Sequence, residues 1–257
     1  MLSILSRRTV GLFVALVMVG AVTFALTEPA RGAVIEHTCA KAGDLQAIID
    51  TASPGDIIDV AAGVCTGKAF PAEDFSISKD IVLRGAGAGL TVLQGSGATN
   101  SRVVGVHEGA VVTLEGLTIT GGTIDKDNSG GGLINDGTTT LVGVEVSGNE
   151  AGSGGGIANN PGASLSLIDS TVSGNIVTNP NSAGGGGITN GQGSTLTLVN
   201  STVSGNRAVA PSSSARGFAG GIQADALSKV SLINSTVTAN VAELGPGGGI
   251  YSFPSAD

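Results

Sequence analysis

Aromatic residues are scarce in this chain of 257 residues, which has no tryptophan, one tyrosine and six phenylalanines. Sugars commonly stack on flat aromatic rings, so the sequence argues against a sugar-stacking surface. Histidine is equally rare, because only His37 and His107 occur. They lie far apart in the sequence, and we expect them to stand alone, without a shared catalytic site.

Basic residues are outnumbered by acidic ones. Lys and Arg total 12, Asp and Glu total 20, and the formal net charge is −8. Removing the first 32 residues would take away three arginines and one glutamate, which would leave a net charge near −10. Such a chain is repelled by nucleic acid and by anionic membrane surfaces, so neither is expected as a partner.

The N-terminus carries a long run without charge, from Thr9 to Thr27. Arg7 and Arg8 precede it, and small residues ending in "ARGA" at Ala33 follow it. This pattern predicts an export signal over residues 1–32, removed to give an extracytoplasmic protein that is secreted or held at the cell surface or outer membrane. The run is also long enough for a retained membrane anchor. "SRRTVGL" is similar to a twin-arginine signal, and the sequence does not separate that route from general secretion.

The two cysteines, Cys39 and Cys65, both follow the expected cleavage point. An oxidising compartment favours a disulfide between them, and two free thiols are the alternative. Between them, Leu45, Ile48 and Ile49 share one face of an expected helix that begins with Asp44 as N-cap and ends before "SPG". Its apolar face would cover the open end of a stacked core, as repeat proteins require.

Glycine is abundant, with 43 residues, and it occurs in clusters. Each cluster is followed by an apolar residue, namely Leu133, Ile157, Ile188, Ile222 and Ile250. An asparagine comes 16 to 18 residues after each of the first four, namely Asn149, Asn175, Asn206 and Asn240. From each asparagine to the next apolar residue the distance varies between 8 and 16 residues. A fixed segment that alternates with a variable one indicates stacked repeat units.

Within the fixed segment, apolar and small polar residues alternate, which predicts strands rather than helices. The apolar positions recur as Leu141, Leu167, Leu198 and Leu232, and as Val146, Val172, Val203 and Val237. One coil of short strands cannot bury its apolar side alone, so successive coils must stack as parallel strands. At the corners, glycine would tolerate a positive φ and would let the backbones of neighbouring coils approach closely. The asparagines would form a hydrogen-bonded ladder along the stack. We therefore expect an all-β, right-handed parallel β-helix over residues 33–257 with a short N-terminal capping helix.

The repeated "TVSGN" at Thr171 to Asn175 and at Thr202 to Asn206, with the glycine clusters, resembles the repeats of polymorphic outer-membrane proteins. Those repeats usually carry phenylalanine where this chain has valine. The segment "DLQAIIDTASPGDIIDVAAGVCTG" is similar to the entrance of a pectin-lyase-like β-helix. This resemblance implies the fold, but the superfamily includes lyases, hydrolases, esterases, adhesins and inert spacers, so it does not imply one activity.

Acidic residues are concentrated in one part of the variable segments, and the weak catalytic candidates are Asp125, Asp127, Asp136 and Glu150. Hydrolases of this fold use paired carboxylates, and lyases use carboxylate-bound calcium with a basic residue. The chain shows no adjacent Asp pair here and no Arg-x-Lys motif, and a solvated acidic loop is the alternative. No metal or other cofactor is expected.

Serine and threonine form two outward columns, which resemble flat ice-binding arrays and which polar β-propensity also explains. We expect an adhesin-like binding or structural module whose partner is a polysaccharide or a cell-surface ligand. The alternative is a carbohydrate-active enzyme, either a lyase or a glycoside hydrolase.

The last segment, "GPGGGIYSFPSAD", begins another coil at Gly247. This predicts a fragment of a longer protein or end-to-end self-association. The sequons at Asn200 and Asn234 are interpreted as turn residues.

Overall fold

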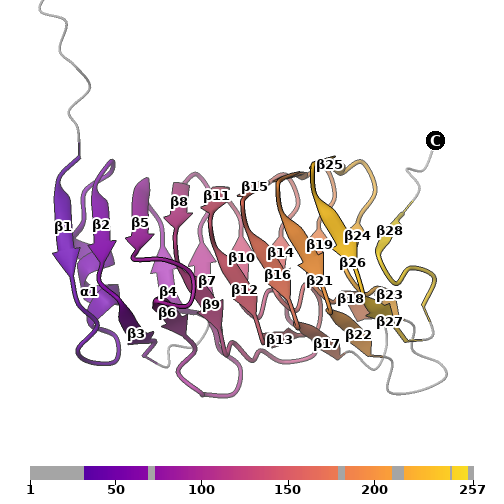
Figure 1. Ribbon diagram of the computed structural model, residues 1–257, viewed down its shortest axis with the longest axis horizontal. Coiled ribbons are helices and arrows are strands. Elements are labelled where there is room, and N and C mark those ends of the chain that lie inside the picture. The colour runs from indigo at the N-terminus through magenta and orange to yellow at the C-terminus, as the bar shows by residue number, and fades with distance from the viewer. Residues whose placement is uncertain (1–31, 69–72, 179–182, 210–216, 244, 254–257) are drawn as a thin grey trace, which may run out of the picture. The chain divides into compact units, whose positions relative to one another are not determined.

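A computed structural model describes residues 32–68, 73–178, 183–209, 217–243 and 245–253 of the protein. The expected export signal, apart from Gly32, lies outside the described residues. The described chain is mostly β-strand with one helix, and its strands pair in parallel and in register. The strands stack coil upon coil as a parallel β-solenoid, which confirms the expected architecture (Figure 1).

Three sheets run along the solenoid, and from β2 onward the chain visits them in the same order in each coil. The first sheet contains β1 (Val34–His37), β2 (Ile57–Val60), β5 (Ile81–Gly85), β8 (Val111–Glu115), β11 (Thr138–Val142), β15 (Ser164–Ile168), β20 (Thr195–Val199) and β25 (Lys229–Ile233). The second contains β3 (Gly63–Thr66), β6 (Thr91–Gln94), β9 (Thr118–Thr120), β12 (Glu145–Ser147), β16 (Thr171–Ser173), β21 (Thr202–Ser204) and β26 (Thr236–Thr238). The third contains β4 (Glu73–Ile77), β7 (Arg102–Val106), β10 (Leu133–Asn135), β14 (Ile157–Asn159), β19 (Ile188–Asn190), β24 (Ile222–Ala224) and β28 (Ile250–Ser252).

The variable segments lie between the second and third sheets. In the later coils they form two smaller parallel sheets. One contains β13 (Glu150–Ala151), β17 (Ile176–Thr178), β22 (Arg207–Val209) and β27 (Val241–Ala242), and the other contains β18 (Ala183–Gly185) and β23 (Gly217–Ala219). Extra chain length is therefore absorbed as additional parallel pairing rather than as a change in the three main sheets.

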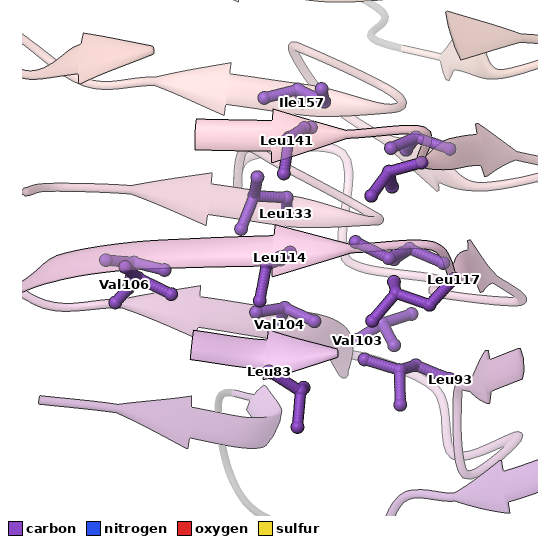
Figure 2. Packing of buried hydrophobic residues seen from close by; sticks show 14 of the residues in the cluster. Leu83, Leu93, Val103, Val104, Val106, Leu114, Leu117, Leu133, Leu141 and Ile157 are labelled. Carbon is purple, nitrogen blue, oxygen red and sulfur yellow. The ribbon is translucent and has the colours of Figure 1, made fainter. Parts of the chain in front are cut away.

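The core consists of columns of aliphatic side chains that face inward from the three sheets. Along the first sheet the partners Leu83, Leu114, Leu141, Leu167 and Leu198 lie in register and are fully buried. Figure 2 shows Leu83, Leu114 and Leu141 facing Val104 and Leu133 of the third sheet. In the last described coil, Leu232 is 40% exposed and Ile250 is 43% exposed.

The corner between the first and second sheets requires left-handed backbone. Its residue has a φ between 50° and 59° in five successive coils, at Gly116, Gly143, Asp169, Asn200 and Asn234. Glycine, aspartate and asparagine are the residues that tolerate this conformation. The asparagines of both sequons are thus turn residues, as the sequence predicts.

The glycine clusters serve mainly for close approach between coils. A Cβ on Gly156 would lie 2.8 Å from the carbonyl oxygen of Gly187 and 2.8 Å from the side-chain nitrogen of Asn175. Gly132, Gly187 and Gly221 meet the next coil in the same way. A side chain at these positions would push neighbouring coils apart, so the clusters set how tightly the asparagine-bearing corner can stack.

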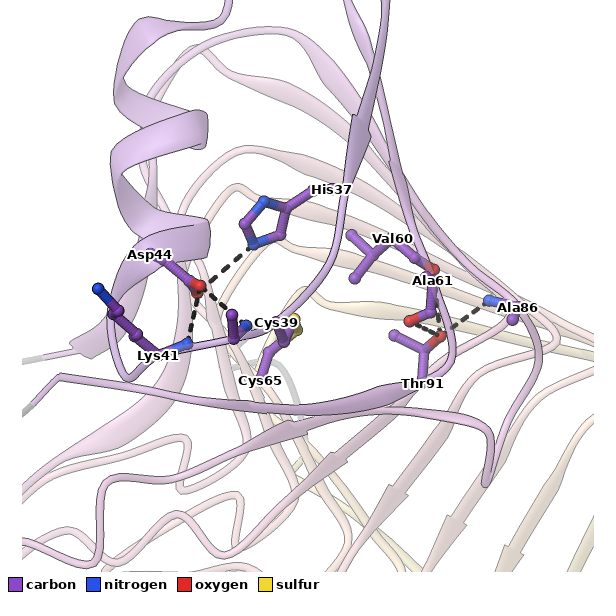
Figure 3. Close-up of a disulfide and its surroundings, with 10 residues drawn as sticks. His37, Cys39, Lys41, Asp44, Val60, Ala61, Cys65, Ala86 and Thr91 are labelled. Atoms are coloured by element: carbon purple, nitrogen blue, oxygen red, sulfur yellow. Dashed lines mark hydrogen bonds and ion pairs between the residues drawn. A yellow bond between two sulfur atoms is a disulfide. The ribbon is translucent and has the colours of Figure 1, made fainter.

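The N-terminal end is closed by α1 (Asp44–Thr51), which buries Leu45 and Ile49 against the core. The N-cap is Gly43, not Asp44, and Asp44 is the first helical residue. The Asp44 carboxylate instead accepts hydrogen bonds from the backbone N–H groups of Ala40 and Lys41, both at 2.9 Å. These hydrogen bonds fix the turn at Lys41 that leads into α1 (Figure 3).

The expected disulfide joins Cys39 to Cys65, whose Cα atoms are 4.8 Å apart. Cys65 lies in β3 and is 1% exposed, and Cys39 follows β1. Figure 3 shows the bond beside the start of α1. It ties the segment before the helix to the second sheet, so the cap is fastened covalently to the stack.

Candidate functional site

The asparagines Asn149, Asn175, Asn206 and Asn240 lie above one another at the corner that follows the second sheet. In all four, the side-chain Nδ2 donates to a carbonyl oxygen of the preceding coil. In the first three, Nδ2 also donates to the Oδ1 of the next asparagine, at 2.9 to 3.0 Å. The same Oδ1 accepts the backbone N–H of the preceding asparagine. Because these amides saturate one another, they stabilise the stack and are not available to a ligand.

A second ladder, which sequence reasoning missed, runs along the end of the third sheet. Nδ2 of Asn135 donates to Oδ1 of Asn159 at 2.8 Å, and Nδ2 of Asn159 donates to Oδ1 of Asn190 at 2.7 Å. All three side chains are at most 1% exposed. The available signal is an asparagine two residues after three of the five apolar residues that follow the glycine clusters, in "LIN", "IAN" and "ITN".

The four acidic candidates lie in two different places. Asp125 and Asp127 are exposed in the connection between β9 and β10, and Asp127 pairs with Lys126 at 3.1 Å. Glu150 is the first residue of β13. Its carbonyl oxygen accepts a hydrogen bond at 3.0 Å from the backbone N–H of Ile124, which lies in that connection. Asp136 follows β10, at the corner between the third and first sheets. Asp136 lines a surface depression at that corner.

A polar cluster on the outer face of the third sheet, which the sequence did not predict, surrounds His107. The ring Nε2 lies 2.7 Å from Oγ of Ser76 and 3.0 Å from Oε1 of Glu73. The other carboxylate oxygen of Glu73 pairs with Arg102 at 3.4 Å. Glu73 and Arg102 are only 12% and 11% exposed at their side chains, while His107 is 47% exposed. The expectation that His107 stands alone is wrong.

The sheet register explains how these residues meet. Glu73 of β4 pairs with Arg102 of β7, and Ser76 pairs with Gly105, which precedes His107 by two residues. A Cβ on Gly105 would come within 2.9 to 3.1 Å of the Glu73 side chain, so the glycine leaves room for that carboxylate to lie across the strand. Burial lowers the pKa of Arg102, and the adjacent Glu73 carboxylate acts in the opposite direction.

His107 also borders a depression of about 640 Å³ at the corner between the third and first sheets. Glu108, Asp136 and Thr138 line it, together with the turn at Pro161 and Gly162. Asp136 accepts a hydrogen bond from Nδ2 of Asn160 at 2.6 Å. The depression therefore brings one imidazole and two carboxylates to an open surface.

The outer face of the first sheet carries hydroxyl groups in register. One rank is Thr113, Thr140, Ser166, Thr197 and Ser231, and a second begins with Thr138, Ser164 and Thr195. Neighbouring strands are about 4.8 Å apart and alternate residues about 6.8 Å apart, so the hydroxyls form a regular array. Thr138 belongs both to this array and to the depression beside His107.

Comparisons with protein-family models, with curated proteins and with solved structures find no match for this chain. Among the described residues, no three or more His, Cys, Asp or Glu side chains are grouped so that they could hold a metal ion. The one helix described, α1, is too short to cross a membrane. We define the candidate site as the His107 cluster, the depression beside it and the hydroxyl array.

Proposed function

We propose that this protein is an extracytoplasmic binding module that contacts a polysaccharide or another hydroxyl-rich polymer through the outer face of its first sheet. The observation that carries this proposal is the hydroxyl array. Its longer rank continues in register from Thr113 in β8 to Ser231 in β25, and its shorter rank spans β11 to β20 between Val111 and Lys229. A repeating ligand can satisfy a repeating surface with many weak hydrogen bonds. Hydrogen bonding between the parallel strands of the first sheet fixes the spacing between neighbouring hydroxyl groups.

The disulfide and the N-terminal sequence support an exported location. A disulfide between Cys39 and Cys65 persists in oxidising compartments, and the N-terminal sequence has the form of an export signal. Within the proposal we retain the similarity to pectin-lyase-like and polymorphic outer-membrane repeats, and with it an adhesin-like role at the cell surface. Within the proposal we also retain end-to-end self-association of the chain.

The proposal is tested by co-sedimentation of the protein, without residues 1–32, with a panel of insoluble neutral, acidic and amino polysaccharides. We expect retention on at least one polymer, and we expect Thr197→Lys to reduce it because a long charged side chain interrupts the array. Ser204→Lys on the second sheet introduces the same charge away from the array and serves as the control. Failure of every polymer to retain the protein would overturn the proposal, and equal losses in the two variants would contradict the choice of face.

A carbohydrate-active enzyme is the second candidate. The observation in its favour is the contact of His107 with Glu73 at 3.0 Å, beside an open depression, because a histidine held by a carboxylate can act as a general base. The same panel separates the two candidates if reducing ends and unsaturated products are measured alongside retention. Turnover that disappears in His107→Asn would establish the enzyme, whereas retention without product supports the binding module.

A further inference from the structure

We propose that the depression beside His107 binds the ammonium group of an amino sugar, so that the polymer recognised by this protein carries positively charged amino groups. This inference rests on the proposed function, because it names the chemistry of the polymer that lies on the hydroxyl array. It is carried by three observations: the shape of the depression, the charges that line it and the way His107 is held.

The depression is a notch that follows from turn lengths at one corner of the solenoid. Four residues, 107–110, connect β7 to β8, and four residues, 160–163, connect β14 to β15. Only two residues, Asp136 and Gly137, connect β10 to β11 between them. The shorter turn forms a floor flanked by two longer turns about 9.6 Å apart, which is twice the strand spacing and wide enough for one sugar ring.

The charges in the notch favour a cation. Asp136 lies on the floor and Glu108 on one wall, and both are exposed. Arg102 is paired with Glu73 and also attracts Asp136, but its single positive charge faces three carboxylates, those of Glu73, Asp136 and Glu108, so negative charge remains in excess. Carboxylates bind ammonium groups through charge-assisted hydrogen bonds and repel other carboxylates, which disfavours uronate polymers such as pectin or alginate at this site.

His107 is held so that one ring nitrogen is left for a ligand. Nε2 is occupied by Ser76 and Glu73, and among the described residues Nδ1 has no partner. In the neutral imidazole, the tautomer that donates Nε2–H to Glu73 has Nδ1 as a hydrogen-bond acceptor for a sugar hydroxyl or ammonium group. Glu73, which is held in turn by Arg102, thus positions the imidazole of His107 at the edge of the notch.

The notch also opens onto the hydroxyl array. Thr138 lines the notch and begins a rank that continues through Ser164 and Thr195 along the first sheet. A polymer that lies along this rank brings its next unit to Asp136. This continuity favours an amino polysaccharide over a lysine side chain of a protein, because a protein ligand has no regular hydroxyls to match the array.

The two histidines of the chain make the proposal directly measurable. His37 lies beside Asp44 under the N-terminal helix, far along the stack from the notch, and its ring reports non-specific effects. The imidazole resonances of both residues are followed by NMR while a glucosamine trimer is added. We expect the His107 ring signals to shift with saturation and the His37 signals to stay unchanged. The N-acetylated trimer and a galacturonate trimer, which lack the amino charge, should leave both unchanged.

Matched substitutions test the charge argument. Asp136→Asn and Glu108→Gln should each weaken binding of the glucosamine trimer roughly tenfold, which corresponds to the loss of one charge-assisted hydrogen bond. Asp127→Asn changes the charge equally at an exposed position outside the notch and should have no effect. Retained His37 signals show that each variant is folded.

The proposal is overturned if the His107 signals do not respond, if the N-acetylated trimer binds equally well, or if Asp127→Asn weakens binding as much as Asp136→Asn. It is also overturned if trilysine binds as tightly as the glucosamine trimer, since the notch would then select peptide amines. If a neutral polysaccharide retains the protein in co-sedimentation and the NMR signals of the His107 ring do not shift, this inference is rejected and the proposed function is supported. Loss of all polymer retention would reject the proposed function itself.

Discussion

The side chain of Gln46 pairs with the backbone of Ser76 as a neighbouring strand would. Its Oε1 accepts the Ser76 N–H at 2.7 Å and its Nε2 donates to the Ser76 carbonyl oxygen at 3.0 Å. Ser76 lies in β4, which is the edge strand of the third sheet, and Gln46 lies in α1. The helix therefore satisfies polar backbone groups at the sheet edge as well as covering the core.

Gln46→Leu should lower the free energy of unfolding by about 1 to 2 kcal/mol, because two partly buried backbone groups lose their partner. Urea denaturation followed by circular dichroism measures the change. Gln192→Leu, in an exposed turn, is the control and should have little effect. An equal effect in both variants would mean that Gln46 does not stabilise the edge.

Asn206→Leu should destabilise the protein by roughly 1 to 3 kcal/mol, because Asn175 and Asn240 each lose a buried amide partner. Asn200→Gly is the matched control, since Asn200 is exposed and its φ of 50° suits glycine. Thermal unfolding of the two variants gives the comparison. An unchanged melting temperature for Asn206→Leu would show that the ladder contributes little to stability.

Gly156→Ala should be strongly destabilising, because the added Cβ would lie 2.8 Å from the carbonyl oxygen of Gly187 in the next coil. Gly249 occupies the same column at the last described coil, and a Cβ there meets only the Val237 side chain at 3.7 Å. Gly249→Ala should therefore be tolerated. Similar denaturation midpoints for the two variants would contradict the idea that coil spacing requires glycine.

Ala239→Gly should stabilise the protein by about 1 kcal/mol. Ala239 has a φ of 53° at the corner where Gly148, Gly174 and Gly205 occupy the other coils. Left-handed backbone costs a residue with a Cβ roughly 1 to 2 kcal/mol, and part of that gain is offset by the greater entropy of glycine in the unfolded chain. A lower midpoint in urea would show that the position is not strained.

Asp44 should make the cap sensitive to acid. Partial desolvation raises the pKa of Asp44, but hydrogen bonds from the backbone of Lys41 and Ala40 and the charge of His37 outweigh it, so that the pKa lies below its usual value of 3.8. A carboxyl group with a lowered folded pKa stabilises the protein above its unfolded pKa and loses that contribution as the pH falls through the folded pKa.

Asp44→Asn should accordingly reduce the melting temperature at pH 7, and the difference from the unsubstituted protein should shrink as the pH falls below about 3.8. Differential scanning calorimetry over this range provides the measurement. Asp127→Asn, a surface change of the same charge, is the reference. A difference that stays constant with pH would assign the effect to lost packing instead.

The repeat pattern allowed much of the fold to be predicted, because the spacing from Leu141 to Val146 is the same in each later coil and fixes the inward face of two sheets. The His107 cluster could not be predicted in this way. Glu73 and Arg102 lie in early coils that lack the glycine clusters, so their register was not available from the repeats. Residues 29 positions apart became neighbours only through strand pairing, which depends on the length of every intervening turn.

The corner between the second and third sheets accommodates connections of different length. Connections of very different length begin there at a ladder asparagine and end at a glycine cluster, while the pairing of the three main sheets continues unchanged on either side. A foreign peptide grafted between β13 and β14 would therefore meet the same tolerance, and the solenoid could display it without a change of register. The same property lets successive coils acquire different surfaces by insertion alone.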